Sequence, residues 1–573
     1  MHRKTIFALV AAGVLAATAA LAGEYLAGDF HQHSLYTDGS NKFNMMMARN
    51  NVYLDWWANS EHGGESNRDG NGRYWDEYAE ILGDVEMSGG HQEMWRWQSL
   101  RDYVFPDILE ARNLYTDKII INGLEWNVPG HEHTSTAIHQ LGEDGNAVAT
   151  AISEFEYRFD KSDDDTSRDG EIGLLGDALS KTNDTKDDAI AGVAFMQALV
   201  DAGIADAWVV PAHIERAHSF FIEDFRNWMD YGPDVAIGFE GAPGHQTSGD
   251  RGFGRSSLGG GTYGGTGWYV SQVGGLWDAL AAEGRKFFNF ASSDDHGNWS
   301  QGGSDFWPGE YQKNYTFVDT SAADPIKAVF EGVKSGNSWN VQGDLIDELR
   351  FTVSTRDASA TMGETLEVEE GDKVTIRITV RDPKGRNNCP LDMDNPSLAQ
   401  IGISQPLSKP ELDHVDLIAG SITGNVPLTD FSDMANQSYV DTDYGTDAAV
   451  VATFDHYSGE PRMTYVYKFR AEKDMFFRVR GTNLPAGVPY ETDDMGNPLA
   501  DSEANDNLYA SMDPAELQAH LFDDVVFTTN SKLDEVAEAY ADLWFYSNPV
   551  YLKVKPKSCD DGKGGKHRRH DDD

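Results

Sequence analysis

The first 320 residues contain seven short apolar runs, each of which predicts a buried β-strand. In chain order they are "YLAGDF", "VYLDWWA", "KIIINGL", "AWVVPA", "VAIGF", "KFFNFAS" and "YTFV". Between them lie stretches with apolar residues at helical spacing, such as "DDAIAGVAFMQALVDAG" and "VSQVGGLWDALAAEG", each ending at a glycine. Strands that alternate with helices predict a parallel sheet, and seven such units fit a closed α/β barrel.

Side chains that bind metal ions follow six of the seven runs, where each strand is expected to end. In an α/β barrel these strand ends meet at one face, where the chemistry takes place. One histidine after a strand is more often a packing residue than a ligand, but this repetition predicts a site with several ions. The residues are His31 and His33; Ser60, Glu61 and His62; Glu125, His131 and His133; His213; Glu240; and Ser293, Asp294, Asp295 and His296.

His31 and His33 stand two residues apart at the end of the first run, and Asp38 follows five residues after His33. In a strand, side chains two residues apart face the same side. Two imidazoles and a carboxylate in this arrangement predict a metal ion. Mixtures of imidazole and carboxylate suit Zn, Mn and Fe, and the presence of only two cysteines argues against thiolate sites.

A glycine-rich stretch, "RGFGRSSLGGGTYGGTGWY", covers residues 251–269 and follows the strand that ends at Glu240. One interpretation is a lid in which Arg251 or Arg255 binds an anionic group of the substrate through its forked guanidinium. The alternative is a surface loop with no catalytic part. Glu240 is a further candidate substrate contact.

After about residue 340 the pattern changes to alternating apolar and polar positions, as in "LEVEEGDKVTIRITVRD" and "RMTYVYKFRAEKDMFFRVRG". Alternation of this kind predicts an antiparallel β-sandwich-like domain, here over residues 341–556. It holds no comparable cluster of histidine and aspartate, so we expect a supporting or binding role. The charged tail, residues 557–573, is expected to be disordered.

The first 22 residues have the composition of a secretory signal peptide. His2, Arg3 and Lys4 precede an apolar stretch, and "ALA" before Gly23 resembles a cleavage site. The alternative is an uncleaved N-terminal anchor. No later segment has about 20 consecutive apolar residues, so we expect no membrane span in the mature protein and a periplasmic or secreted location.

The formal net charge of −48 makes nucleic acid and anionic membranes poor partners, unless metal ions invert the field locally. A small-molecule substrate is the expected partner, and the oligomeric state is left open. The two cysteines, Cys389 and Cys559, have no metal-type spacing. In an exported protein they form either one disulfide or two free thiols.

Several motifs carry a resemblance to a known family. "DFHQHSLYTDGS" resembles the first motif of PHP (polymerase and histidinol phosphatase) domains, and "ASSDDH" resembles their closing motif. "NSEH", "NGLEW" and "VVPAH" are similar to the motifs between them, with two departures: Glu61 stands where Asp is usual, and the proline precedes His213. "NGLEWNVPGHEH" and "GSDFWPGEYQKNY" resemble an exported carbaryl-hydrolase-like or DUF3604-like group.

The resemblance implies a distorted (β/α)7 barrel over residues 23–340 with two or three divalent Mn, Zn or Fe ions. His31, His33, Glu125 and Asp294 would hold one part of the cluster, with Glu125 as a bridging carboxylate. The remaining ligands would be His62, His131, His213 and His296, with Asp38 near a third ion and His133 competing with His131 for one place.

The chemistry expected of such a cluster is hydrolysis by a metal-activated hydroxide, with Glu125, Asp294 and His213 as the catalytic residues. A small phosphoester is the expected substrate. A carbamate, amide or carboxyl ester is the alternative, because the same nucleophile attacks carbon. A protein of another class, a metal-stabilised binding protein of the cell surface, is a second alternative. Neither G-x-S-x-G nor a P-loop motif occurs in the chain, which weakens serine-hydrolase and nucleotide-triphosphatase interpretations.

Overall fold

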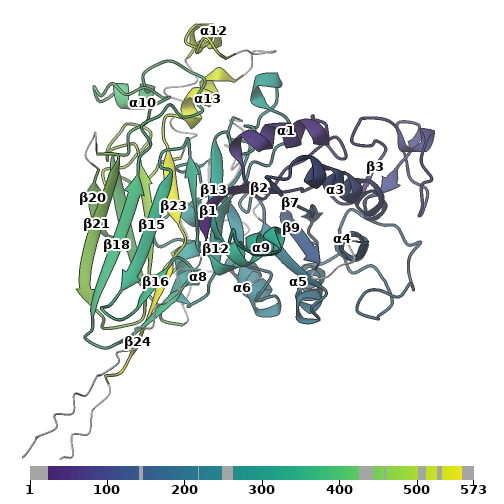
Figure 1. Cartoon of the computed structure of the whole chain (residues 1–573), viewed down its shortest axis with the longest axis horizontal. Helices are drawn as coiled ribbons and strands as arrows, with labels where there is room; N and C mark the ends of the chain where they lie inside the picture. Colours follow the sequence, from purple (N-terminus) through teal and green to yellow (C-terminus); the bar gives the residue numbers. More distant parts are fainter. Residues whose placement is uncertain are drawn as a thin grey trace, which may run out of the picture.

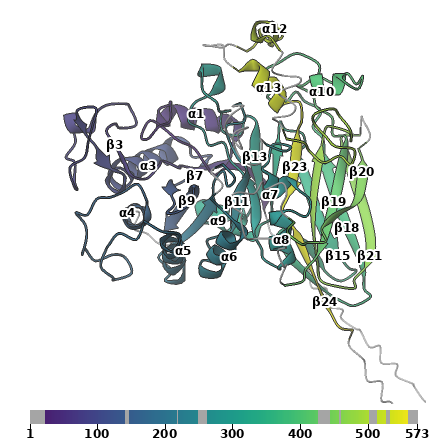
Figure 2. The same cartoon turned by 180° about the vertical axis from the view of Figure 1, so that it is seen from behind.

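The computed structural model describes residues 23–140, 146–216, 219–247, 262–424, 443–456, 460–500, 512–525 and 532–557. The expected signal segment, Arg251, Arg255, Cys559 and almost all of the tail lie outside the described residues. The described part is mixed α/β, with helices gathered in the N-terminal half and long strands in the C-terminal half (Figures 1 and 2). None of the helices in these ranges is long and apolar enough to cross a membrane.

One sheet of eleven strands runs through both halves of the molecule. β19 (His414–Ser421) pairs with β22 and with β20 (Ala449–Asp455) beside the main path. The main path is β17 (Thr365–Glu369), β24 (Val550–Lys555), β22 (Met475–Thr482), β23 (Trp544–Ser547), β14 (Ser338–Gln342), β13 (Gln312–Val318), β1 (Glu24–Asp29), β2 (Trp56–Ala58) and β7 (Ile119–Ile121).

All seven apolar runs form strands. The first three contribute the parallel neighbours β1, β2 and β7, with β8 (Gly123–Asn127) directly after β7. The others form β10 (Ala205–Pro211), β11 (Gly238–Ala242), β12 (Phe288–Ala291) and β13, of which β11 and β12 pair in parallel. Short bridges then join neighbouring strand ends, Gln32 to Asp295 and His62 to Glu125.

The expectation of an all-parallel arrangement is wrong in two places. β9 (His133–Gln140) inserts between β8 and β10 and is antiparallel to both. The connection from β8 to β9 has room for a turn only, whereas a parallel pair needs a crossover of a dozen or more residues. β13 is antiparallel to β1. Residues 292–311 before β13 contain only the short helix η3 (Trp299–Gln301), so the chain turns back instead of crossing over.

The helices match the sequence pattern where capping residues are present. α5 (Lys186–Asp201) begins at a capping box formed by Thr185 and Asp188 and ends before Gly203, whose φ is 66°. The second expected helix is divided into α7 (Trp268–Ser271) and α8 (Leu276–Ala282) by two glycines. The longer remaining helices are α1 (Phe43–Tyr53), α3 (Phe105–Leu114), α4 (Asn146–Phe159), α6 (Ile222–Tyr231) and α9 (Pro325–Ser335).

Short elements complete the described chain. They are β3 (Glu65–Ser66), η1 (Trp75–Glu77), β4 (Met87–Ser88), β5 (His91–Gln92), β6 (Met94–Trp95), α2 (Arg96–Ser99), η2 (Leu100–Val104), α10 (Pro396–Ala399), α12 (Pro514–Gln518) and α13 (Leu533–Ala539).

In the C-terminal half a second, four-stranded antiparallel sheet packs against the large one. Its order is β16 (Ser359–Thr361), β15 (Glu348–Ser354), β18 (Lys373–Arg381) and β21 (Arg462–Arg470). Alternate residues of β18, such as Val374 and Ile376, are buried in a core shared with Leu417 and Phe477 of the large sheet. Period-two alternation in the sequence therefore reports which face of each strand is covered.

The two halves are tied together by backbone and side chains. β14 pairs with β23, so the boundary expected at residues 340 and 341 falls inside a strand of the shared sheet. Arg478 of β22 makes a two-pronged ion pair with Asp278 of α8, at 2.6 and 2.9 Å, and both side chains are buried. Cys389 is buried and makes no disulfide among the described residues, and Cys559, with which the sequence allows one, lies outside them.

Candidate metal centre

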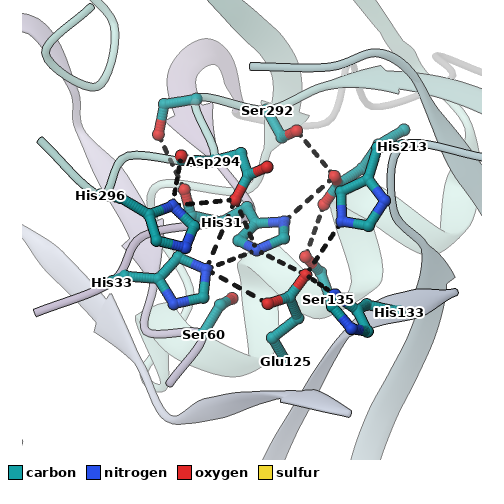
Figure 3. A network of polar contacts seen from close by, with 12 residues as sticks. His31, His33, Ser60, Glu125, His133, Ser135, His213, Ser292, Asp294 and His296 are labelled. Carbon is teal, nitrogen blue, oxygen red and sulfur yellow. Dashed lines mark hydrogen bonds and ion pairs between the residues drawn. The ribbon is translucent and has the colours of Figure 1, made fainter. Parts of the chain in front are cut away.

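The floor of the site is formed by two histidines that leave β1 on the same side. Nε2 of His31 lies 2.9 Å from Nε2 of His33, and both rings are fully buried (Figure 3). The bridge between Gln32 and Asp295 holds this segment against the end of β12. The spacing of two residues therefore places both imidazoles in one cluster, as the sequence predicts.

Two buried carboxylates complete the floor. The Nε2 atom of His31 lies 3.2 Å from Oε1 of Glu125 and 3.3 Å from Oδ1 of Asp294. The Nε2 atom of His33 lies 3.3 Å from Oε2 of Glu125 and 3.4 Å from Oδ1 of Asp294. These four side chains thus direct their donor atoms at one point.

A second group opens toward solvent. Asp38 approaches His33, His62 and His296 at 3.3 to 3.4 Å, and its side chain is 54% exposed. His62 also contacts Oε2 of Glu125 through Nδ1, at 2.9 Å. The floor is therefore closed by protein, and the mouth of the site lies on the side of Asp38.

A third group lies on the other side of Glu125. Oε1 of Glu125 is 2.9 Å from Nδ1 of His133 and 3.1 Å from Nε2 of His213. Glu132 approaches both rings, at 3.8 and 3.9 Å. Among the described residues, Glu125 is thus the carboxylate that touches donors of all three groups.

The structure separates His131 from His133. The ring of His131 is directed away from the cluster: Nε2 lies 3.1 Å from Asp224, and Nδ1 lies 3.0 Å from the carbonyl of Pro129. His131 also stacks on Phe220. It falls in the turn before β9, whereas His133 begins β9 and faces Glu125. The place for which the two histidines compete is therefore occupied by His133.

Glu240 lies behind His31, on the buried side of the cluster, where a substrate has no access. It is fully buried, with Oε2 3.2 Å from Nδ1 of His31 and 2.7 Å from the hydroxyl of Ser292. The Ser135 hydroxyl donates to Oε1 at 2.5 Å. Glu240 thereby fixes which nitrogen of His31 faces the cluster, a role that carboxylates often have behind metal-binding histidines.

Glu61, the departure from the usual motif, is buried and binds the first loop. Its carboxylate accepts from the backbone N–H of Ser34 at 3.1 Å and from the hydroxyls of Ser34 and Thr37. The longer side chain therefore anchors the loop that carries Asp38.

Sequence reasoning missed three residues that contact this centre. His245 approaches Asp294 at 2.5 Å, Arg216 approaches His213 at 3.0 Å, and Glu132 is described above. His245 follows the "VAIGF" run, but Glu240 comes first after that run and is the residue that the pattern of strand ends selects. Arg216 stands three residues after His213, and this closeness in the sequence is the feature that could have identified it as a residue of the site.

Backbone conformation at the site is unusual. His213, Asp294 and His245 have φ of 32°, 47° and 60°, in the left-handed region that residues with side chains rarely adopt. Such strain is tolerated where the surroundings hold the residue firmly, and it gathers at functional sites.

The pKa values of the site residues are shifted because acidic and basic side chains are buried next to one another. Burial alone would raise the pKa of Glu125, but the neighbouring His133, His62 and His31 hold it well below its usual range. Burial would lower the pKa of His31, but Glu125, Asp294 and Glu240 raise it well above the ordinary value. The pKa of His213 is lowered to about 3 by burial and by Arg216. His213 is therefore a neutral imidazole at neutral pH.

The donor set fits divalent metal ions. Eleven His, Asp and Glu side chains form five overlapping groups whose donor atoms lie within 4.8 Å of one another. Ligands bonded at about 2.0–2.2 Å are separated by about 3.0–3.5 Å, which is the spacing on the floor. Glu125 Oε2 and Asp294 Oδ1 are buried and accept no well-aligned hydrogen bond in the described part of the chain, so the atoms that face them are histidine nitrogens, which are themselves metal donors.

No protein-family model matches the chain, and no curated protein matches it. Among solved structures, it is similar to the crystal structure of a two-domain protein containing a predicted PHP-like metal-dependent phosphoesterase from Bacteroides vulgatus. The two are 12% identical, the match covers 84% of this chain and 94% of that chain, and the TM-score is 0.29. A TM-score of this size does not establish a shared fold.

Proposed function

We propose that the protein is an exported metal-dependent hydrolase of the PHP type that acts on a small phosphoester. One observation carries the proposal: donors from the middle of β8 and from the ends of β1, β2, β10 and β12 converge at spacings that suit directly bonded ions. The barrel and β-sandwich architecture, the cleaved signal peptide and the periplasmic or secreted location belong to the same proposal and rest on the sequence patterns.

Two or three divalent Mn, Zn or Fe ions would occupy the three groups around Glu125. When bound, such ions lower the pKa of water toward neutrality and stabilise charge on the attacked and leaving oxygens. His31, His33 and Asp294 would hold the floor, His133 and His213 one side, and Asp38, His62 and His296 the other. Glu125, which touches all three groups, would be the shared ligand.

Arg216 favours a phosphoester over a neutral ester. Its side chain is one quarter exposed. The guanidinium contacts His213, and its Nη1 lies 3.9 Å from Asp294 Oδ2. A guanidinium is always charged and its planar fork matches the oxygens of a phosphoryl group. An anionic phosphoryl group would therefore gain a contact that a carboxyl or carbamate ester cannot use. The net charge of −48 disfavours large polyanions as substrates.

The test is metal analysis joined to a substrate screen. The purified protein should contain at least two transition-metal ions per chain. After chelation and reloading with Mn²⁺ or Zn²⁺, it should hydrolyse p-nitrophenyl phosphate or bis-p-nitrophenyl phosphate. The matched carboxyl ester, p-nitrophenyl acetate, and a p-nitrophenyl carbamate complete the screen.

Three outcomes decide. Phosphoester turnover that is lost on chelation and restored by metal supports the proposal. Turnover of the carboxyl ester or carbamate alone, by fully loaded protein, would replace it with the alternative hydrolase. Full metal content with no turnover of any ester would favour a binding protein.

A further inference from the structure

His245 lies between two carboxylates from a different part of the chain. It follows β11 and is 2% exposed, with Nε2 2.5 Å from Oδ2 of Asp294 and Nδ1 in contact with Oδ1 of Asp305. None of the quoted sequence motifs includes His245, whereas Asp305 lies in "GSDFWPGEYQKNY", where no role was predicted for it. Both ring nitrogens therefore face carboxylates, Nδ1 in a hydrogen bond with Asp305 and Nε2 in a close ionic contact with Asp294.

The two oxygens of Asp294 face different surroundings. Oδ1 is directed at the floor and lies 3.3 to 3.4 Å from nitrogens of His31, His33 and His296. Oδ2 faces His245, with Arg216 farther away at 3.9 Å. The carboxylate torsion of aspartate is broad and roughly two-fold, so a free side chain could exchange its oxygens or turn both toward the cluster. The contact with His245 removes that freedom.

Asp305 connects His245 to the chain segment that carries Asp294, so that the contacts among the three residues form a closed ring. Its Oδ2 accepts from the backbone N–H groups of His296 and Gly297, at 2.6 and 3.0 Å. Its Oδ1 faces His245 and accepts from Ser304 at 3.0 Å. The same carboxylate therefore fixes the segment that carries Asp294 and the imidazole that holds Asp294.

We propose that His245 is a positioning residue that, anchored by Asp305, holds Oδ2 of Asp294 so that Oδ1 alone is presented to a metal ion. The proposal rests on the proposed metal centre. Ligand atoms on one ion are separated by about 3.0–3.5 Å, and the 2.5 Å between His245 Nε2 and Asp294 Oδ2 is shorter than that, so His245 acts through the aspartate. Loss of a group that orients a ligand typically weakens metal affinity by about 10- to 100-fold.

The experiment is a calorimetric titration of chelator-stripped protein with Mn²⁺, followed by counting the bound ions. H245N is the main variant, because asparagine tolerates the left-handed backbone at this position. D305N removes the charge of the anchor while keeping an acceptor oxygen. H139N is the matched control, since His139 makes a comparable contact with Asp324, at 2.8 Å, at the far end of β9.

We expect H245N to bind as many Mn²⁺ ions as the wild type, with the dissociation constant of one ion increased by about 10- to 100-fold. D305N should weaken the binding of the same ion, and H139N should leave the dissociation constant of every ion unchanged. Wild-type binding constants in folded H245N would overturn the proposal. Loss of one ion with the other constants unchanged would make His245 a ligand and would also overturn it.

The outcomes are separable from failure of the proposed function. If the wild type binds no Mn²⁺, the metal centre itself is wrong. If circular dichroism shows H245N to be unfolded, D305N decides, because wild-type constants in folded D305N would contradict the anchoring by Asp305.

Discussion

The Nε2 atoms of His31 and His33 face each other at 2.9 Å in a fully buried floor. Two neutral imidazoles placed in this way share one hydrogen bond at most, and two charged ones repel each other. The same two atoms also face Glu125 and Asp294. This arrangement is unfavourable for hydrogen bonding, but it is the arrangement expected of ligand atoms that surround one cation.

Replacing His31 and His33 together with alanine should remove at least one ion from the metal-loaded protein. The reason is that the floor then keeps only Glu125 and Asp294, fewer donors than the four of a tetrahedral site. Elemental analysis of the purified variant measures the loss, with H139A as the control. Full metal content in the folded double variant would show that the centre lies elsewhere.

The variant E125Q should reduce phosphoester turnover by about 100-fold or more, since it removes a charge that touches all three donor groups while nearly preserving shape. Steady-state kinetics at saturating Mn²⁺ measure the effect. Thermal unfolding should show that the variant remains folded. Wild-type turnover in E125Q would remove Glu125 from the mechanism.

Arg216 should discriminate between substrates by charge. R216A is expected to lower kcat/KM for p-nitrophenyl phosphate by about 10²-fold, the scale seen when one charge-stabilising donor is removed. Hydrolysis of any neutral ester should change little, and R216K should recover part of the loss because lysine keeps the charge without the fork. An equal loss on charged and neutral substrates would indicate a structural role instead.

Metal binding should release protons at neutral pH. Burial opposes charge on His31 and His62, but the adjacent carboxylates raise the pKa of both well above 6.5, which shifts the metal-free rings toward the protonated form. An incoming ion displaces these protons, and affinity should therefore rise with pH. Mn²⁺ titrations in buffers of different ionisation enthalpy should show at least one proton released per chain.

The raised pKa values of His31 and His62 also predict that the metal-free protein becomes less stable as pH rises, although its metal affinity increases. A histidine with a raised pKa stabilises the fold below the unfolded pKa, and this stabilisation is lost as pH rises through the folded pKa. The melting temperature of the chelated protein should therefore fall above about pH 6.5, whereas the loaded protein should lack this decline. A chelated protein that becomes more stable over the same range would contradict the shifts.

The buried pair between the halves should matter for stability. D278N leaves the Arg478 guanidinium buried without its carboxylate, a change that typically costs about 3–5 kcal/mol. D357N breaks a pair that is largely exposed, Arg356 with Asp357, and should cost less than about 1 kcal/mol. Denaturant unfolding of the two variants gives the comparison. Equal effects would show that the contact with Asp278 does not tie the halves together.

The sequence by itself determined the local features. Apolar runs gave the seven strands because burial requires continuous apolar side chains, and alternation gave the C-terminal strands because one face of each is covered. The pair His31 and His33 could be placed on one face from its spacing alone. Strand ends also located most of the donors, since parallel strands deliver their last residues to one edge.

Tertiary structure decided what depends on contacts between distant segments. His131 and His133 have the same chemistry and lie on the same stretch, and only the pairing of β9 with β8 turns His133 toward Glu125 and leaves His131 beside Asp224. Glu240, expected as a substrate contact, lies behind His31, because β11 places it on the buried side of the cluster. His245 and Asp305 meet at Asp294 only because the loops after β11 and β12 fold onto each other, and no local pattern encodes a contact across 60 residues.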